Sequence, residues 1–170
     1  MNKLFVFTFL IFAFCGITNA QQPLSYSETI QVDSMSKKVL FTKVKNWFAE
    51  TYQLSKEVLR VEDSTSGELI GKSSFTYNYE TFLGYISYNI KVLVKDNKYK
   101  VEIYNFEQQC LGDFSYGLLS TETEFPRTPT NFAKKTYNKN WSDMKARSEL
   151  EAKSLMNSLK EAIKKPAENW

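Results

Sequence analysis

L-R-V-E-D-S-T-S-G-E-L-I-G-K, at Leu59–Lys72, is the stretch that most directly indicates the fold. The side chain of Asp63 can hydrogen-bond to nearby backbone groups, and Gly67 can adopt a positive φ without steric cost. Gly71 indicates a bulge or the close approach of another element. Because apolar and β-branched residues lie on both sides of the turn, we predict a hairpin between strands over 57–62 and 68–77.

The residues before this hairpin predict a strand followed by an amphipathic helix. Apolar and polar residues alternate over 26–33, and Ser34 is a good N-cap for a helix over 35–52. The apolar stripe of that helix consists of Leu40, Val44, Trp47, Phe48 and Thr51. Because Trp47 and Phe48 follow the helical period, we interpret them as core residues rather than as a ligand-binding pair.

Two further strands are predicted after a turn region over 78–84. The strand over 85–95 alternates most clearly, and one of its faces carries Ile86, Tyr88, Ile90, Val92 and Val94. Asp96 and Asn97 then make a tight turn. The chain returns over 98–106, with Tyr99, Val101 and Ile103 on one face.

The C-terminal part combines an irregular connection with a long helix. Residues 107–136 show no strong periodicity, and about 30 residues is long for a connection in a compact domain. We expect a short helix or an extra edge strand within it. A helix is predicted over 141–165 with Ser142 as its cap, and Pro166 ends it, which leaves 166–170 as a tail.

The order strand, helix, four strands, helix predicts a single α+β domain over 26–165. Four consecutive strands joined by short turns form a largely antiparallel sheet, and both helices can cover one of its faces. The opposite face is then predicted to be polar and open to a partner. Its residues are Arg60, Glu62, Asn89, Lys91, Lys100, Glu102 and Tyr104.

The N-terminus has the pattern of a secretory signal peptide over 1–20, followed by a short tail over 21–25. Lys3 precedes an almost wholly apolar run, and Ala20 ends a cleavage signal. The alternative is a buried N-terminal helix. Because the apolar run is shorter than the roughly 20 residues that span a bilayer, we expect no transmembrane helix in the mature chain.

Export sets the expected compartment and charge of the mature protein. Phe14 precedes Cys15, which argues against lipid anchoring, because lipid attachment requires a small residue at that place. We therefore expect the protein in the periplasm or outside the cell. Removal of 20 of the 170 residues leaves 21 basic and 19 acidic side chains, and this near balance gives no reason to expect a nucleic-acid partner.

Four stretches together resemble a known family: K-N-W-F at 45–48, V-E-D-S-T-S-G-E-L-I-G-K at 61–72, I-S-Y-N-I-K-V-L-V at 86–94 and K-D-N-K-Y-K-V-E-I at 95–103. They resemble an uncharacterised family of secreted Bacteroidota proteins, a domain of unknown function with a TATA-binding-protein-like fold. The resemblance covers the best-matched core, 27–106, and implies one half of that fold. It implies no activity and no functional residues.

The residue types exclude several kinds of chemistry. The chain has no histidine, which excludes Ser-His-Asp and Cys-His catalysis and histidine-ligated metals. Gly67 takes the fifth place in the acidic loop that begins at Asp63, whereas a calcium-binding EF-hand has glycine at the sixth. Cys110 has no histidine to activate it, so we interpret it as a buried or half-buried thiol, with intermolecular pairing as the alternative. No catalytic residue, cofactor or metal is predicted.

Three functions are compatible with these observations. The first is a non-enzymatic module that binds an envelope protein or glycan through the open polar face or an edge of its sheet. The second is a hydrolase that acts on envelope glycans with carboxylates alone. The third is a structural subunit that forms oligomers.

Overall fold

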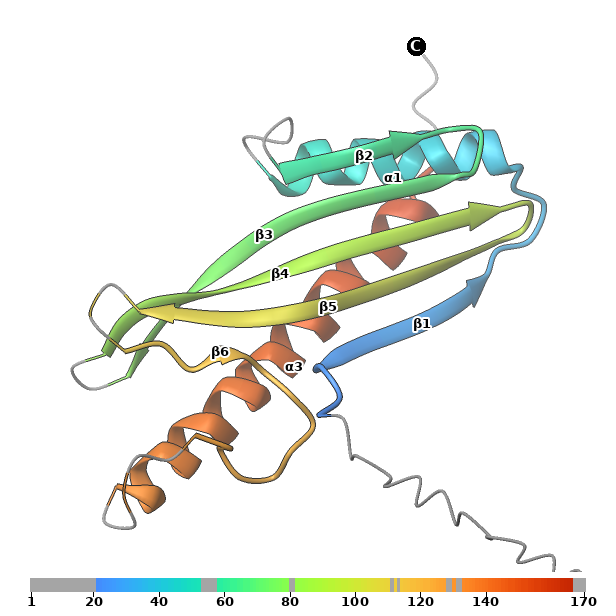
Figure 1. The fold of residues 1–170 in the computed structure, drawn as a ribbon. Coiled ribbons are helices and arrows are strands. Elements are labelled where there is room, and N and C mark those ends of the chain that lie inside the picture. The colour runs from blue at the N-terminus through green and yellow to red at the C-terminus, as the bar shows by residue number, and fades with distance from the viewer. Residues whose placement is uncertain are drawn as a thin grey trace, which may run out of the picture.

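The structure, a computed structural model, describes residues 21–52, 58–79, 82–110, 112, 114–127, 130 and 133–166. The predicted signal peptide and most of the C-terminal tail lie outside these residues. The elements in chain order are β1 Ser25–Gln31, α1 Lys37–Thr51, β2 Leu59–Asp63, β3 Glu68–Tyr79, β4 Phe82–Lys95, β5 Lys98–Cys110, β6 Gly117–Leu118 and α3 Lys134–Lys164 (Figure 1).

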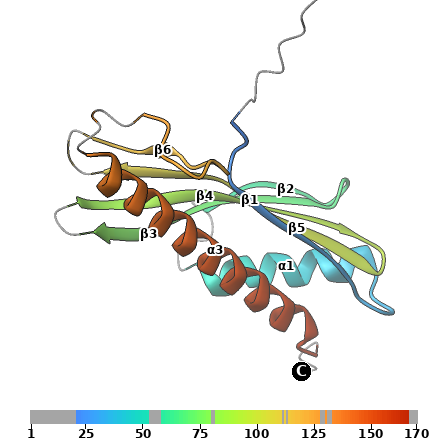
Figure 2. The same cartoon turned by 90° about the horizontal axis from the view of Figure 1, so that it is seen from below.

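The strands form one six-stranded antiparallel sheet in the order β1-β5-β4-β3-β2. The short strand β6 pairs with β5 beyond the end of β1, so β1 and β6 follow one another along the same side of β5. Both helices lie on one side of the sheet (Figure 2). The predicted α+β class, with an antiparallel sheet and two helices on one face, is therefore confirmed.

The core lies between the helices and the inner face of the sheet. The residues predicted to face inward on β4 and on the first half of β5 are all buried. They are Ile86, Tyr88, Ile90, Val92, Val94, Tyr99, Val101 and Ile103. Trp47 is only 2% exposed, and its indole N–H donates to Ser158 Oγ at 3.0 Å. Trp47 and Phe48 therefore belong to the core, as their helical period indicates.

The hairpin at residues 63–68 has the predicted conformation. Gly67 has a φ of +80°, and its N–H donates to Asp63 O at 2.8 Å. Asp63 Oδ1 accepts hydrogen bonds from Thr65 N at 2.8 Å and from Ser66 N at 3.2 Å. Hydrogen bonds from the side chain and the backbone N–H of Ser66 and from Thr65 N–H lower the pKa of Asp63. The acidic loop therefore uses Asp63 to close its own turn.

Gly71 marks the close approach of another element, which is one of the two meanings its place in a strand suggests. A Cβ atom at this position would lie 2.7 Å from Cε1 of Phe48 in α1. The absence of a side chain therefore allows the ring of Phe48 to lie directly on β3.

The N-cap of the first helix differs from the prediction. Ser36, and not Ser34, accepts from Val39 N, at 3.4 Å, whereas Ser34 has a φ of +58°. The turn between β4 and β5 fixes this start, because Asp96 Oδ1 accepts from Lys37 N at 2.7 Å. Asn97, which lies in the predicted tight turn and has a left-handed φ of +60°, accepts through Oδ1 from Met35 N at 3.0 Å.

Two predicted boundaries in the rest of the chain are wrong. The turn region over 78–84 is instead part of a continuous hairpin, in which Asn78 pairs with Leu83. The C-terminal helix begins at Lys134, and Ser142 lies inside it. Its additional first turns pack by tertiary contacts, because Tyr137 and Trp141 contact the ring of Phe125 with centroids 5.7 and 5.4 Å apart.

The irregular connection contains the extra edge strand that the sequence left open as an alternative, β6. An isolated bridge from Pro23 to Ser120 continues this pairing towards the N-terminus. Aromatic rings of Phe114, Tyr116 and Phe125 pack beside the start of α3. Among the described residues, no helix is both long and apolar enough to cross a membrane.

Candidate functional site

The side of the sheet opposite α1 and α3, here called the open face, carries most of the residues predicted for it. Strand register places them in cross-strand rows. Tyr104 lies opposite Asn89, Glu102 opposite Lys91, and Lys100 opposite Leu93. The structure therefore brings together Asn89, Lys91, Lys100, Glu102 and Tyr104 on two neighbouring strands.

Glu62 does not belong to this face, which corrects the prediction. It pairs with Leu69, a core residue, and its carboxylate accepts from Lys45 Nζ of α1 at 2.7 Å. The cause is a register shift between Leu59 and Val61, which reverses the alternation of the following residues. Arg60 lies within this irregular step and is exposed.

Ion pairs on the open face leave its charges accessible. Lys91 Nζ lies 2.5 Å from Glu68 Oε1, and this hydrogen bond raises the pKa of the Lys91 amine. Lys100 Nζ lies 3.6 Å from Glu102 Oε2. The Lys91–Glu68 pair is half-buried and the Lys100–Glu102 pair is more exposed. Pairs at the surface contribute only about 0–1 kcal/mol to stability, so a partner can exchange them for its own groups at low cost.

Apolar side chains between these charges were missed in the prediction. Ile70 lies opposite Lys91, Leu93 lies opposite Glu68, and Val61 lies opposite Ile70 with 37% of its surface exposed. Their places in the strand alternation would have identified Ile70 and Leu93, which fall out of phase with the core residues. The open face is therefore amphipathic rather than uniformly polar.

A shallow hollow of about 240 Å³ lies on the open face where β3, β4 and β5 run side by side. Small side chains create it, because Ser74 pairs with Ser87 across the strands. The Tyr85 hydroxyl donates to Gln109 Oε1 at one side. The lining is completed by Lys72 and Ser73.

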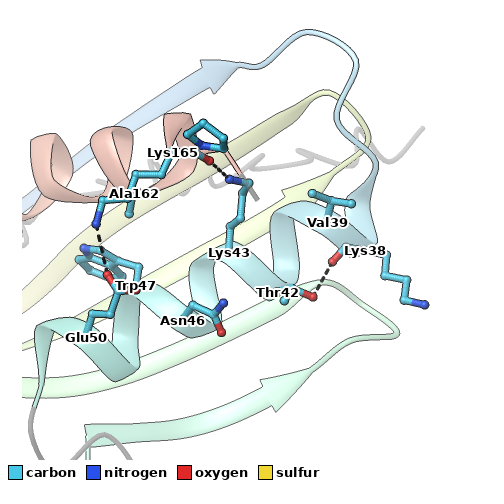
Figure 3. Close-up of a pocket in the computed structure, with 10 residues that line it drawn as sticks. Lys38, Val39, Thr42, Lys43, Asn46, Trp47, Glu50, Ala162 and Lys165 are labelled. Atoms are coloured by element: carbon cyan, nitrogen blue, oxygen red, sulfur yellow. Dashed lines mark hydrogen bonds and ion pairs between the residues drawn. The ribbon is translucent and has the colours of Figure 1, made fainter. Parts of the chain in front are cut away.

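A larger groove of about 710 Å³ lies on the other side of the molecule, between α1 and the end of α3 (Figure 3). Its apolar surfaces come from Val39, Trp47, Ala162 and Pro166. Two of its lysines are engaged within the groove, since Lys43 Nζ donates to the Lys165 carbonyl and Lys165 Nζ lies 3.5 Å from Glu50.

Within the described residues, neither hollow is lined by the two carboxylates that a carboxylate-only hydrolase requires. In the described part of the chain, the hollow on the sheet is lined by no carboxylate and the groove by Glu50 alone. No group of three His, Cys, Asp or Glu side chains that could hold a metal occurs among the described residues. Cys110, half-buried at the end of β5, receives a hydrogen bond on Sγ from Gly112 N at 3.4 Å.

Comparison with known proteins identifies the fold. Residues 26–109 match the family described as a domain of unknown function (DUF4468) with TBP-like fold. A DUF4468 family protein from Bacteroides ovatus superimposes with a TM-score of 0.62 at 15% identity, over 87% of this chain and 90% of that one. A TBP-like protein from Parabacteroides distasonis gives 0.58 at 13% identity, over 81% and 93%. None of the curated proteins matches the chain.

Proposed function

We propose that this chain, in which residues 26–109 match the DUF4468 family with its TBP-like fold, is an exported, non-enzymatic binding module. Its partner, an envelope protein or glycan, binds the open face of the sheet. Export rests on the signal-peptide pattern of the N-terminus.

The observation that supports this proposal is the composition of the open face. No described helix covers it, and it combines the cation Lys91 with the apolar residues Ile70 and Leu93. Apolar area in the centre and exchangeable charges around it are the features by which a protein surface binds a partner. Tyr104 adds a half-exposed aromatic residue, one of the types enriched at interfaces.

A hydrolase that uses carboxylates alone is the alternative. It requires two carboxyl groups about 5–10 Å apart in a cleft. Within the described residues, Glu102 and Glu68 are paired with lysines on an open sheet, and Glu62 lies on the side of the helices. Because these carboxylates do not face one another in a cleft, we favour the binding module over the hydrolase.

The proposal is tested by affinity purification of the tagged protein from its native envelope. The face variant Lys91→Ala/Lys100→Ala/Tyr104→Ser is compared with wild type by mass spectrometry and by glycan analysis. A control, Lys38→Ala/Lys153→Ala, removes two exposed lysines from the helices. We expect the face variant to lose a partner that wild type and control retain. Equal recovery by all three proteins would contradict the proposal.

A further inference from the structure

Strand β3 has a long unpaired edge. On one side it pairs with β4 along its whole length, from Glu68 to Tyr79. On the other side it pairs with β2 only as far as Gly71. Of the residues that the structure describes, none pairs with β3 beyond that point, and Figure 2 shows this half of β3 at the margin of the sheet.

The other margins of the sheet carry features that discourage strand addition. The outer strand β2 is short, has an irregular register and contains Arg60, Glu62 and Asp63. The outer strand β1 contains Glu28, which is paired with Lys160 of α3 at 2.7 Å. Charges, short length and bulges are the usual means by which edge strands avoid pairing with another chain.

The open part of β3 has none of these features. Residues 73–78 read S-S-F-T-Y-N, without a charge, a proline or a glycine. They are continuous in register with β4. Such an edge presents outward N–H and C=O groups in the spacing of an extended strand, so that another strand can replace water as their partner.

We propose that this edge pairs with the same edge of a second copy of the chain, related by a two-fold axis. The segment is self-complementary. With the axis at Phe75, Ser74 faces Thr76 of the second copy and Ser73 faces Tyr77. Phe75 faces Phe75 of the second copy, and no like charges are opposed within 73–78. Aromatic and small polar cross-strand pairs of this kind stabilise antiparallel strands.

The side chains on this edge fit such a role on both faces. Phe75 is only partly buried, and its ring lies 6.2 Å from that of Tyr88 on the side of the helices. On the open face, Ser74 and Thr76 are small and exposed, so that a second strand can approach. Pairing would join the two sheets and leave Lys91 and Tyr104 accessible. This inference therefore goes beyond the binding module and can fail independently of it.

Sedimentation equilibrium of the purified mature protein, from about 1 µM to about 1 mM, tests the inference over the range of weak to moderate affinities. The edge variant Ser74→Lys/Thr76→Lys opposes like charges across the proposed pair. Its matched control, Ser25→Lys/Ser27→Lys, places the same charges on the open face of β1 at the opposite margin. Circular dichroism establishes that each variant is folded.

We expect a monomer–dimer equilibrium for wild type and control, and a monomer for the edge variant. A wild type that stays monomeric throughout, or an edge variant that dimerises like wild type, would overturn the inference. Hydrogen exchange of the wild type provides a readout that needs no substitution. The amides of 74–78 should become more protected as concentration rises, and unchanged protection in the dimer would likewise overturn it.

Discussion

Single residues in this protein fix where strands turn and which way they face. Gly67 closes the hairpin between β2 and β3, and its carbonyl accepts from Val94 N at 2.8 Å. A Cβ atom at this position would lie 2.5 Å from the Val94 carbonyl oxygen, in addition to the strain of a positive φ. The turn at Gly67 can be predicted from the sequence, because glycine alone tolerates both the positive φ and the close approach of the Val94 carbonyl oxygen.

Replacement of Gly67 by valine should therefore destabilise the domain by about 1–3 kcal/mol or more. For a chain of this size the melting temperature should fall by roughly 2–4 °C for each kcal/mol. The control Gly112→Ala adds a Cβ whose nearest neighbour is Cys110 Sγ at 3.9 Å, an ordinary contact. Equal melting temperatures for Gly67→Val and wild type would show that the turn is assigned wrongly.

The raised pKa values of two tyrosines predict that the domain loses stability at alkaline pH. Burial, and then the charge of Glu28, raises the pKa of Tyr99 to about 12. Burial and Glu149 likewise raise the pKa of Tyr26 to about 12. Because the folded state holds these protons more tightly than the unfolded state, their contribution is complete below pH 10. It is lost as the pH rises from about 10 to about 12.

Tyr99→Phe should reduce this alkaline loss, since phenylalanine has no proton to release. The measurement is the fall in melting temperature between pH 8 and pH 11 for wild type and for Tyr99→Phe. An equal fall in both proteins would show that Tyr99 does not contribute to it.

Among the elements, the β4–β5 turn and the start of α1 form one unit. Asp96 Oδ1 accepts from Lys37 N. The backbone of Asn97 accepts from Val32 N and donates to Met35 O. A carboxylate at a helix N-terminus also interacts favourably with the helix dipole. The turn therefore determines where the helix begins.

Asp96→Ala should cost about 0.5–2 kcal/mol, the usual effect of losing a side-chain acceptor at a helix N-terminus. Asp33→Ala is the control, because Asp33 is an exposed aspartate that precedes the same helix. Urea denaturation measures both. If the two variants lose the same stability, the connection between turn and helix contributes nothing.

An element can be predicted from the sequence when neighbouring residues determine it, and not when contacts with distant strands or helices do. Alternation and helical period predicted β4, the first half of β5 and most of the apolar stripe of α1. The prediction of Thr51 in that stripe is wrong, because Thr51 is exposed and Phe41 is buried instead. A left-handed Asn105, with a φ of +55°, shifts the register opposite Tyr88 and brings Phe106 inward. Neither this bulge nor the one that turns Glu62 towards Lys45 leaves a strong local signal, because partner strands and helices determine both. The early start of α3 likewise depends on contact with Phe125.

The whole molecule has two layers, the sheet and the two helices on one of its faces. The helices bury one face of the sheet, and the open face combines Lys91, Glu102 and Tyr104 with the apolar residues Ile70 and Leu93. Sequence patterns indicated which strands carry this face. They could not show that Glu62 leaves it, since this depends on the register shift in β2.

Photo-crosslinking in the native envelope tests the binding of a partner on the open face most directly. A benzophenone amino acid replaces Thr29 on the open face in one protein and Lys153 on α3 in the other. Thr29 is exposed and lies opposite Lys100, and it is not one of the residues changed in the face variant. Lys153 is exposed and lies on the side of the helices. We predict an adduct with an envelope component from position 29 and none from position 153. Absence of an adduct at 29, or the same adduct from both positions, would contradict the account.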